Sequence, residues 1–391
     1  MIKQILKMLW KQRGSHSGIF IEQLLVTVVL MLATVQVAEM VKKYKTPGLL
    51  SIDNTFCIGY MTSSGVSSEE QTDLRQKIEV VIGHLRQLPC VEVISNSYNL
   101  IPYLRNDVFY SRISDSVYVD DKQFWTIIKS SDEFGAAVLQ PEMEEGTWLE
   151  NRVLPDGSTP VVITRQFADK AGWTTGAGKK ITFQGIVLTV VGVAAGLKQE
   201  PFFPSPVAMV LPYRGGSGMY SESIARIKAG KEQEFIDAFY KEFQRLVSDE
   251  RIEPLLTDMQ MCKGIWVSNT ILGVTLQSIP TIFLFIFAFI GTFGLHWMIS
   301  RKRMKEFALR IALGSTHKQL MNIVIGESLL ITVIAIIPAL LLSFFIYEYT
   351  LVHAIAVGAT IVIMSLFSFI SAWYPAYKVS RVNPAEALQY E

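Results

Sequence analysis

The sequence predicts an integral membrane protein, with an α-helical part of four transmembrane helices and a large extracytoplasmic α+β domain. The chain has 391 residues, of which 50% are hydrophobic and 18% are charged, and its mean hydropathy is +0.31. This composition is too apolar for one soluble globule and too charged for a chain that lies wholly in the membrane. The apolar residues also cluster, with one long run near the N-terminus and three after residue 270.

Four segments are long enough to cross a hydrocarbon core, for which about 20 apolar residues suffice. They are residues 19–41, 271–299, 319–347 and 351–373. The first segment has an apolar centre and carries its polar residues near its ends, where they can reach the interface. A cleaved signal peptide is the alternative for this segment. The length of the apolar run, and Gln36 in the small-x-small pattern that ends at Ala38, favour a membrane anchor.

Basic residues beside the spans set the predicted orientation. Lysines and arginines precede the first span, fill the loop 300–318 and follow the last span, whereas the loop 348–350 has none. These basic sides are therefore predicted to be cytoplasmic, which places both termini inside and residues 42–270 outside. Three lysines just after the first span favour the opposite orientation, but the basic residues at the three other boundaries favour this one.

Both ends of the chain are predicted to lie at the cytoplasmic face. Residues 1–18 begin with apolar positions on one helical face and lysines around the other. This pattern predicts either an amphipathic helix in contact with membrane lipids or an ordinary basic flank. Residues 374–391 form a short cytoplasmic tail.

The outside domain, residues 42–270, shows the same order of elements near its two ends. Each end has a strand-like run, a helical pattern and a second strand-like run, at 55–61, 69–88 and 91–94 and again at 223–227, 231–247 and 252–256. Two such units around a long insertion predict a split βαβ, ferredoxin-like module. The insertion, roughly residues 101–220, is β-rich, with a hairpin turn at Gln184 and Gly185.

The loop between the second and third spans, residues 300–318, carries its own helical pattern. One stripe of this short helix is apolar and consists of Met304, Phe307, Ala308, Ile311 and Ala312. Glu306 and Arg310 are four residues apart with the acid first, a spacing worth about 0.3 kcal/mol. Gly314 then allows the helix to stop. The pattern fits two structures equally, a foot that another protein moves or a basic helix on anionic lipid.

No catalytic or metal site emerges from the motifs. The GAGKK stretch fails the P-loop pattern, because Trp173 stands where the first glycine belongs and Lys180 replaces the serine or threonine. It is therefore predicted to be a turn between strands. The five histidines have no metal-ligand spacing, and a net charge of +1 provides no global basic field for nucleic acid. We expect no enzyme activity and no cofactor in this chain itself.

Glu327 is an acid well within a predicted span. An ionised carboxylate in the hydrocarbon region is costly, so it should face other helices or water and find a hydrogen-bond donor. A functional role and a packing role are both consistent with this position. The three cysteines all fall in the outside domain, and an odd number leaves at least one of them unpaired within the chain.

Several separated motifs resemble the MacB/FtsX-type ABC transporter permeases, also called mechanotransmission transporters. The stretch from Glu306 to Ser315 resembles the family's E-I-G-I-R-x-A-x-G-A pattern, and Glu327 resembles the glutamate of its third span. YPAYKVSRVNPAEAL, residues 374–388, resembles the family's C-terminal ending. In the outside domain, PVVITRQFADKAGW and GKKITFQGIVLTVVGVA resemble the MacB-like periplasmic core.

The resemblance implies a permease dimer, of identical or related chains, in a bacterial inner membrane, bound to two cytoplasmic ABC ATPase subunits that hold the ATP. The segment 300–318 would be the coupling helix. Its implied ATPase-coupling residues are Met304, Lys305, Glu306, Phe307, Arg310, Ile311 and Gly314, and Glu327 is an intramembrane functional candidate. MacB carries a fused N-terminal ATPase, and none precedes the first span here, so we expect the ATPase on a separate chain.

Three functions fit these expectations. The first is export or extrusion of a substrate from the outer face, with a periplasmic adaptor or an outer-membrane channel as partner. The second is a non-transporting regulator, in which ATPase-driven motion acts on a cell-wall hydrolase. The third is a membrane-anchored sensor, which would need no ATPase partner.

Overall fold

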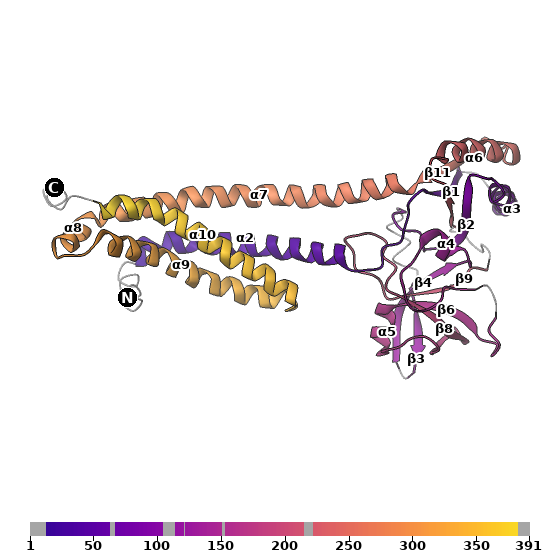
Figure 1. Cartoon of the computed structure of the whole chain (residues 1–391), viewed down its shortest axis with the longest axis horizontal. Coiled ribbons are helices and arrows are strands. Elements are labelled where there is room, and N and C mark those ends of the chain that lie inside the picture. Colours follow the sequence, from indigo (N-terminus) through magenta and orange to yellow (C-terminus); the bar gives the residue numbers. More distant parts are fainter. Residues whose placement is uncertain are drawn as a thin grey trace. The chain divides into compact units, whose positions relative to one another are not determined.

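The computed structural model describes residues 13–62, 67–104, 114–120, 122–150, 153–214 and 222–381, which divide into two compact units (Figure 1). One unit contains the chain up to Lys42 and from Ile271 onward, and the other is Lys43–Thr270. Within the described residues, the chain has four helices that are long and apolar enough to cross a membrane, as the sequence predicts. They are α2 (Arg13–Lys45), α7 (Met259–Lys302), α9 (His317–Ile346) and α10 (Leu351–Ser380).

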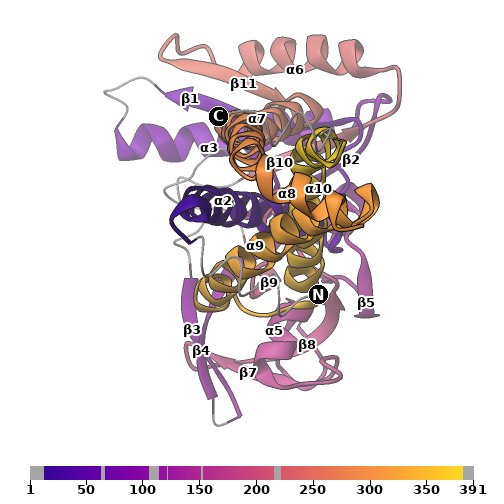
Figure 2. The same ribbon diagram turned by 90° about the vertical axis from the view of Figure 1, so that its left-hand side faces the viewer.

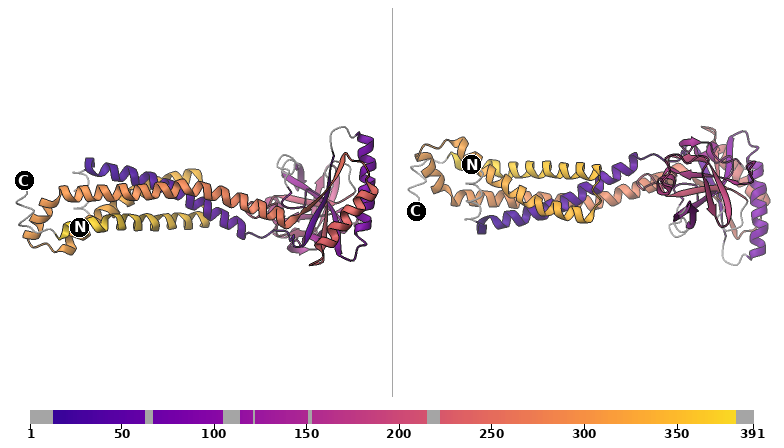
Figure 3. Two further views of the ribbon diagram at one scale, coloured as in Figure 1. Left: turned by 90° about the horizontal axis from the view of Figure 1, so that it is seen from above. Right: turned by 90° about the horizontal axis from the view of Figure 1, so that it is seen from below.

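The helices extend beyond the apolar segments that predict them. Helix α7 begins well before residue 271, and α10 continues to Ser380, through part of the predicted tail. The amphipathic pattern of residues 1–12 and the final motif residues after Arg381 lie outside the described residues. A short helix, α8 (Met304–Ala312), connects α7 to α9. The four long helices run alongside one another, as the end-on view in Figure 2 and the side views in Figure 3 show.

Polar side chains inside this helical unit pair with one another across helices. His296 Nε2 of α7 lies 2.9 Å from Ser328 Oγ of α9, which lies 2.6 Å from Ser368 Oγ of α10. On α9, Thr332 donates to Gln23 of α2 at 2.8 Å. Interhelical hydrogen bonds of this kind hold membrane helices together where lipid removes the hydrophobic driving force.

The outer unit contains a four-stranded antiparallel module, which the first and last parts of its sequence form together. Its strands are β1 (Thr55–Thr62), β2 (Val91–Tyr98), β10 (Glu222–Ile227) and β11 (Ile252–Asp258), and its helices are α3 (Ser68–Leu85) and α6 (Glu232–Leu246). The strand order is β11-β1-β10-β2, and each neighbouring pair is antiparallel. Along the chain, α3 lies between β1 and β2, and α6 lies between β10 and β11.

The two helices of this module pack together on one face of its sheet (Figures 1 and 3). Helix α6 buries Phe235, Phe239 and Phe243, which recur every four residues and so lie on one stripe. Helix α3 begins with a capping box, in which Ser67 and Glu70 satisfy each other's backbone N–H groups. It ends at Leu85, before the predicted limit of 88.

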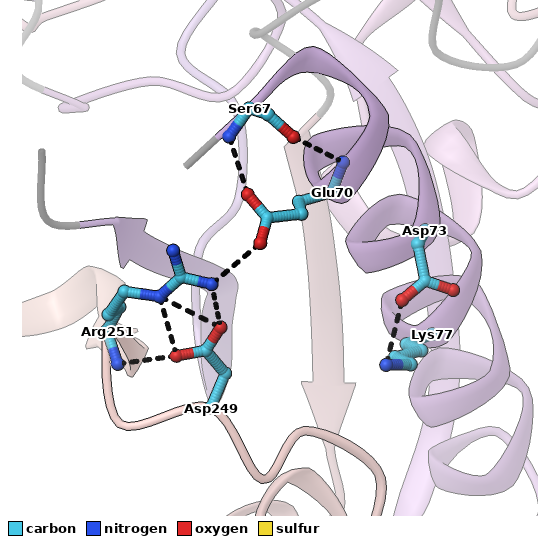
Figure 4. A network of polar contacts seen from close by, with 6 residues as sticks. All are labelled: Ser67, Glu70, Asp73, Lys77, Asp249 and Arg251. Carbon is cyan, nitrogen blue, oxygen red and sulfur yellow. Dashed lines mark hydrogen bonds and ion pairs between the residues drawn. The ribbon is translucent and has the colours of Figure 1, made fainter. Parts of the chain in front are cut away.

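Figure 4 shows an ion-pair network at the start of α3. Arg251 donates to Glu70 at 2.9 Å and to Asp249 at 2.6 Å. The backbone hydrogen bond from Ser67, together with Arg251, lowers the pKa of Glu70 to about 2. The network ties the N-terminus of α3 to the loop before β11.

The insertion between β2 and β10 folds into a closed ring of six strands in the order β4-β3-β7-β8-β6-β9, with β9 also pairing β4. The insertion's elements are β3 (Ser114–Val119), β4 (Lys122–Ser131), α4 (Gly135–Leu139), β5 (Met143–Gly146), β6 (Thr159–Thr164), α5 (Arg165–Ala171), β7 (Lys180–Phe183), β8 (Ile186–Ala194) and β9 (Ala208–Pro212). The predicted hairpin turn between β7 and β8 is confirmed, since Gln184 and Gly185 both have positive φ. A separate apolar core fills the ring around Phe167 and Met209.

Candidate functional site

Helix α8 packs its apolar stripe against its own chain. Phe307 is 1% exposed and lies in one cluster with Leu320 and Val324 of α9 and Ala376 and Val379 of α10. Burial of an aromatic side chain of this size is a large stabilising contribution. The family resemblance implies that Phe307 takes part in ATPase coupling, and in the structure its side chain is covered by residues of this chain.

The surface of α8 that remains open is different from the predicted stripe. Leu309 is 54% exposed and Leu313 is 79% exposed, and Lys305 is also exposed. Of the other residues of the predicted stripe, Met304 and Ile311 are half-buried and Ala312 is exposed, and Gly314, with a φ of +94°, makes the turn after the helix. An amphipathic pattern predicts which face is apolar, and here two large apolar side chains lie outside that face.

The strongest polar feature at α8 is a buried ion pair that the sequence analysis missed. Arg303 Nη1 donates to Glu327 Oε2 at 2.6 Å, and the two side chains are 7% and 5% exposed. The expected donor to Glu327 is therefore an arginine at the junction of α7 and α8. The signal was present in the sequence, because an intramembrane acid needs a cationic partner and Arg303 is one of the basic residues after the second span.

The ion pair continues into α8. Glu306 Oε2 accepts from Arg303 Nε at 3.1 Å, and Glu306 Oε1 accepts from Arg310 at 2.7 Å. The guanidinium of Arg303 also lies over the Phe307 ring, 4.9 Å from its centroid. We call Arg303, Glu306, Arg310 and Glu327 the charge network. It joins α8 to α9 by charge at the same place where Phe307 joins them by packing.

Within this network, Arg303 and Glu306 favour each other's charged form. Burial by itself would lower the pKa of Arg303, but the charge of Glu327 and the hydrogen bonds to both carboxylates raise it. Burial would likewise raise the pKa of Glu306, but the hydrogen bond and charge of Arg303 outweigh burial and lower it. Separating the buried pair of Arg303 and Glu327 is costly, since either partner alone would lie uncompensated.

The GAGKK stretch is a turn, as predicted, and its backbone donors are occupied. The N–H groups of Gly176 and Ala177 donate to Glu145 Oε2 at 2.8 and 3.0 Å, and Arg165 donates to Glu145 Oε1 at 2.6 Å. The hydrogen bond from Ala177, followed by that from Arg165, lowers the pKa of Glu145. A carboxylate of this chain therefore fills the position that a phosphate would take in a P-loop. Across the described ranges, no cluster of three histidine, cysteine or acidic side chains could hold a metal ion.

Two family models match the chain and together span most of it. The model of the MacB-like periplasmic core domain matches residues 24–238, more than half of the 391 residues, and the model of the FtsX-like permease C-terminal region matches residues 278–384. The chain belongs to the family of MacB/FtsX-like ABC transporter permeases. Membership and the four apolar helices indicate an inner-membrane subunit.

The relatives of this permease are distant. It is 22% identical over 264 residues to the pyoverdine export ATP-binding/permease protein PvdT of Pseudomonas fluorescens (strain Pf0-1). The match covers 63% of this chain and 40% of PvdT, so this chain spans less than half of that relative's length.

Two solved structures resemble the outer domain. The periplasmic region of MacB from Actinobacillus actinomycetemcomitans matches at 15% identity and a TM-score of 0.38, over 55% of this chain and 92% of that one. The extracellular domain of the noncanonic ABC-type transporter YknZ from Gram-positive bacteria matches at 17% identity and a TM-score of 0.36, over 52% of this chain and 100% of that one.

Proposed function

We propose that this permease couples ATP hydrolysis in a separate cytoplasmic ABC ATPase to motion of its outer domain, with α8 as the coupling helix. The observation that carries the proposal is the charge network. A force applied to α8 reaches α9 through the ion pair between Arg303 and Glu327, and it reaches α9 and α10 through the buried ring of Phe307. A rigid connection of this kind moves as one body, because protein interiors are densely packed.

The proposed ATPase contact is the open surface of α8, with Lys305, Leu309 and Leu313 at its centre. Exposed apolar side chains next to basic ones suit a protein groove with an apolar floor and an acidic rim. Met304, Ile311 and Gly314 then set the shape of the helix and its turn rather than making the contact. Glu306 and Arg310 are half-buried, and Arg303 connects them to Glu327 by hydrogen bonds.

Export or extrusion of a substrate is the function we favour over regulation of a hydrolase. The relative PvdT is named a pyoverdine export ATP-binding/permease protein. We also propose that two permease chains, identical or related, act together. One face of α7 supports this, since it presents exposed apolar side chains at Leu272, Leu276, Ile279, Phe283 and Phe287.

Co-purification tests the coupling assignment. The permease is purified in mild detergent with its bound chains, and Leu313→Asp is compared with wild type. We expect wild type to retain a nucleotide-binding subunit and Leu313→Asp to lose it while the permease stays folded. Val153→Asp is the matched control, since Val153 is 63% exposed in the outer domain and gains the same charge. A wild-type permease with no nucleotide-binding partner would favour the sensor alternative instead.

A further inference from the structure

A loop of the outer domain holds the last turn of α2, at the point where the chain leaves that helix. Lys198 is 1% exposed, and its ammonium group donates to the carbonyl oxygens of Lys43 and, at 2.6 Å, Thr46. The carbonyl groups at the end of a helix lack partners within the helix, and together they carry a partial negative charge. A buried ammonium group therefore satisfies these carbonyls and stabilises the charge at once.

The same loop closes around the residues after the helix. The carbonyl of Gly48 accepts from the Lys198 N–H at 2.8 Å, and the backbone of Gly48 has a φ of +106°. A Cβ atom on Gly48 would lie 2.7 Å from Cα of Gly196, so only glycine fits this contact. The rings of Tyr44 and Phe202 stack with their centroids 5.6 Å apart. We call the loop from Gly196 to Phe202 the α2 socket.

We propose that the α2 socket is the joint through which motion of α2 reaches the outer domain, with Lys198 as its positioning residue. The inference rests on the proposed function, since it assigns the place where the proposed motion is passed on. A helix end without satisfied carbonyls frays, and a frayed turn absorbs displacement instead of passing it on. Burying a lysine side chain is costly in free energy. Lys198 is buried at the C-terminal end of α2, where fraying of the helix would begin.

The chain offers variants that loosen the socket in two independent ways. Lys198→Met removes the ammonium group and keeps most of the side-chain length, while Lys198→Arg keeps the charge. Gly48→Ala forces the backbone of the exit turn away from Gly196 without changing any charge. The controls are Lys179→Met, at an exposed lysine, and Gly230→Ala, at a glycine with a φ of +78° and open space around it.

The test uses the full-length permease with its co-purified ATPase subunit in detergent. Hydrogen exchange of outer-domain amides is measured with and without ATP and Mg²⁺, and ATPase binding is measured in parallel. We expect Lys198→Met and Gly48→Ala to keep the ATPase bound and to lose the ATP-dependent change in exchange. Lys198→Arg and both controls should keep that change.

The outcomes distinguish two roles of the α2 socket: transmission of motion, or stabilisation of the end of α2 alone. A cap would lower the melting temperature and speed exchange at the end of α2, yet the ATP-dependent change in the folded outer domain would persist at wild-type size in Lys198→Met. That result would overturn the inference and leave the proposed function standing. A wild-type complex whose outer domain does not respond to ATP would overturn both.

Discussion

Arg303 Nη1 and Glu327 Oε2 lie 2.6 Å apart in a buried setting, and this pair links the start of α8 to the interior of a membrane helix. Arg303 lies at the N-terminal cap of α8, whereas Glu327 lies in α9. The pair therefore joins two elements that the turn at Gly314 separates along the chain. A chain in which α8 moves with α9 needs such a link, since a turn alone would bend.

We predict strong coupling between Arg303 and Glu327 in stability. Breaking a buried ion pair from one side costs about 3–5 kcal/mol, because the remaining charge is left uncompensated. Arg303→Gln and Glu327→Gln should each destabilise the permease by an amount of this order, and the double variant should cost clearly less than their sum. Denaturant unfolding of the four proteins of the cycle measures this. Strictly additive effects would show that the pair is not coupled.

Glu327→Gln should also reduce function while the ATPase stays bound. The amide keeps the shape of the carboxylate but removes the charge that faces Arg303, so α8 can move without α9. The measurement is ATP-dependent hydrogen exchange in the outer domain, with the amount of bound ATPase as the control. An unchanged response would mean that Glu327 serves packing alone.

Phe307→Ala should act through stability rather than through direct loss of an ATPase contact. Removing a buried phenylalanine side chain costs about 3–5 kcal/mol, and this ring fills the cluster between α8, α9 and α10. We expect a lower melting temperature, with ATPase still bound to the fraction that is folded at low temperature. Leu309→Asp should show the opposite result, with normal melting and lost ATPase, since Leu309 is exposed.

The lowered pKa of buried Lys129 predicts that the stability of the outer domain depends on pH in the alkaline range. Its side chain is 1% exposed and donates to the carbonyl of Asn99, and burial lowers its pKa from 10.5 to about 8 although Glu222 opposes this shift. Between these two values the unfolded chain holds a proton that the folded chain has released, so the free energy of unfolding rises with pH. The rise is of the order of 3 kcal/mol, at about 1.36 kcal/mol for each pKa unit.

Unfolding of the permease monitored by tryptophan fluorescence between pH 7 and 10.5 measures this rise. Lys129→Met should remove it, because no group at that position then titrates. Lys179→Met, at an exposed lysine of the same domain, should leave the rise in place. A Lys129→Met protein with an unchanged pH profile would assign the rise to other groups.

The depressed pKa of Glu70 predicts a dependence of the same sign in acid, where the free energy of unfolding again rises with pH. Its pKa is about 2 in the folded protein and 4.5 ordinarily, so the folded state binds fewer protons between these values. The stabilisation is fully present above pH 4.5 and is lost as the pH falls toward 2. Glu70→Gln should flatten this part of the profile at the start of α3, which amide exchange of residues 68–72 would measure. An acid profile that Glu70→Gln leaves unchanged would contradict the assignment.

Local patterns in the sequence determine much of this fold. Apolar runs predict the four long helices because each run must fill a hydrocarbon core by itself, and period and turn chemistry predict α3, α6 and the β7–β8 hairpin from neighbouring residues alone. The start of α7 was not predictable in this way. Its first turns contain Met259, which is buried in the outer-domain core, and Trp266, which donates to the carbonyl of Tyr103 at 3.0 Å.

What only the tertiary structure decided is which partner each side chain meets. The amphipathic pattern of residues 304–312 shows that one face is apolar, but it contains no information about whether α9, lipid or another protein covers that face. Likewise, the position of Glu327 in a span predicts that its carboxylate has a hydrogen-bond donor, but only the fold shows that this donor is Arg303. Lys198 carries no pattern at all, because the carbonyls it satisfies lie about 150 residues earlier in the chain. Periodicity is a property of neighbours, whereas burial and charge pairing depend on contacts between distant residues, which exist only after folding.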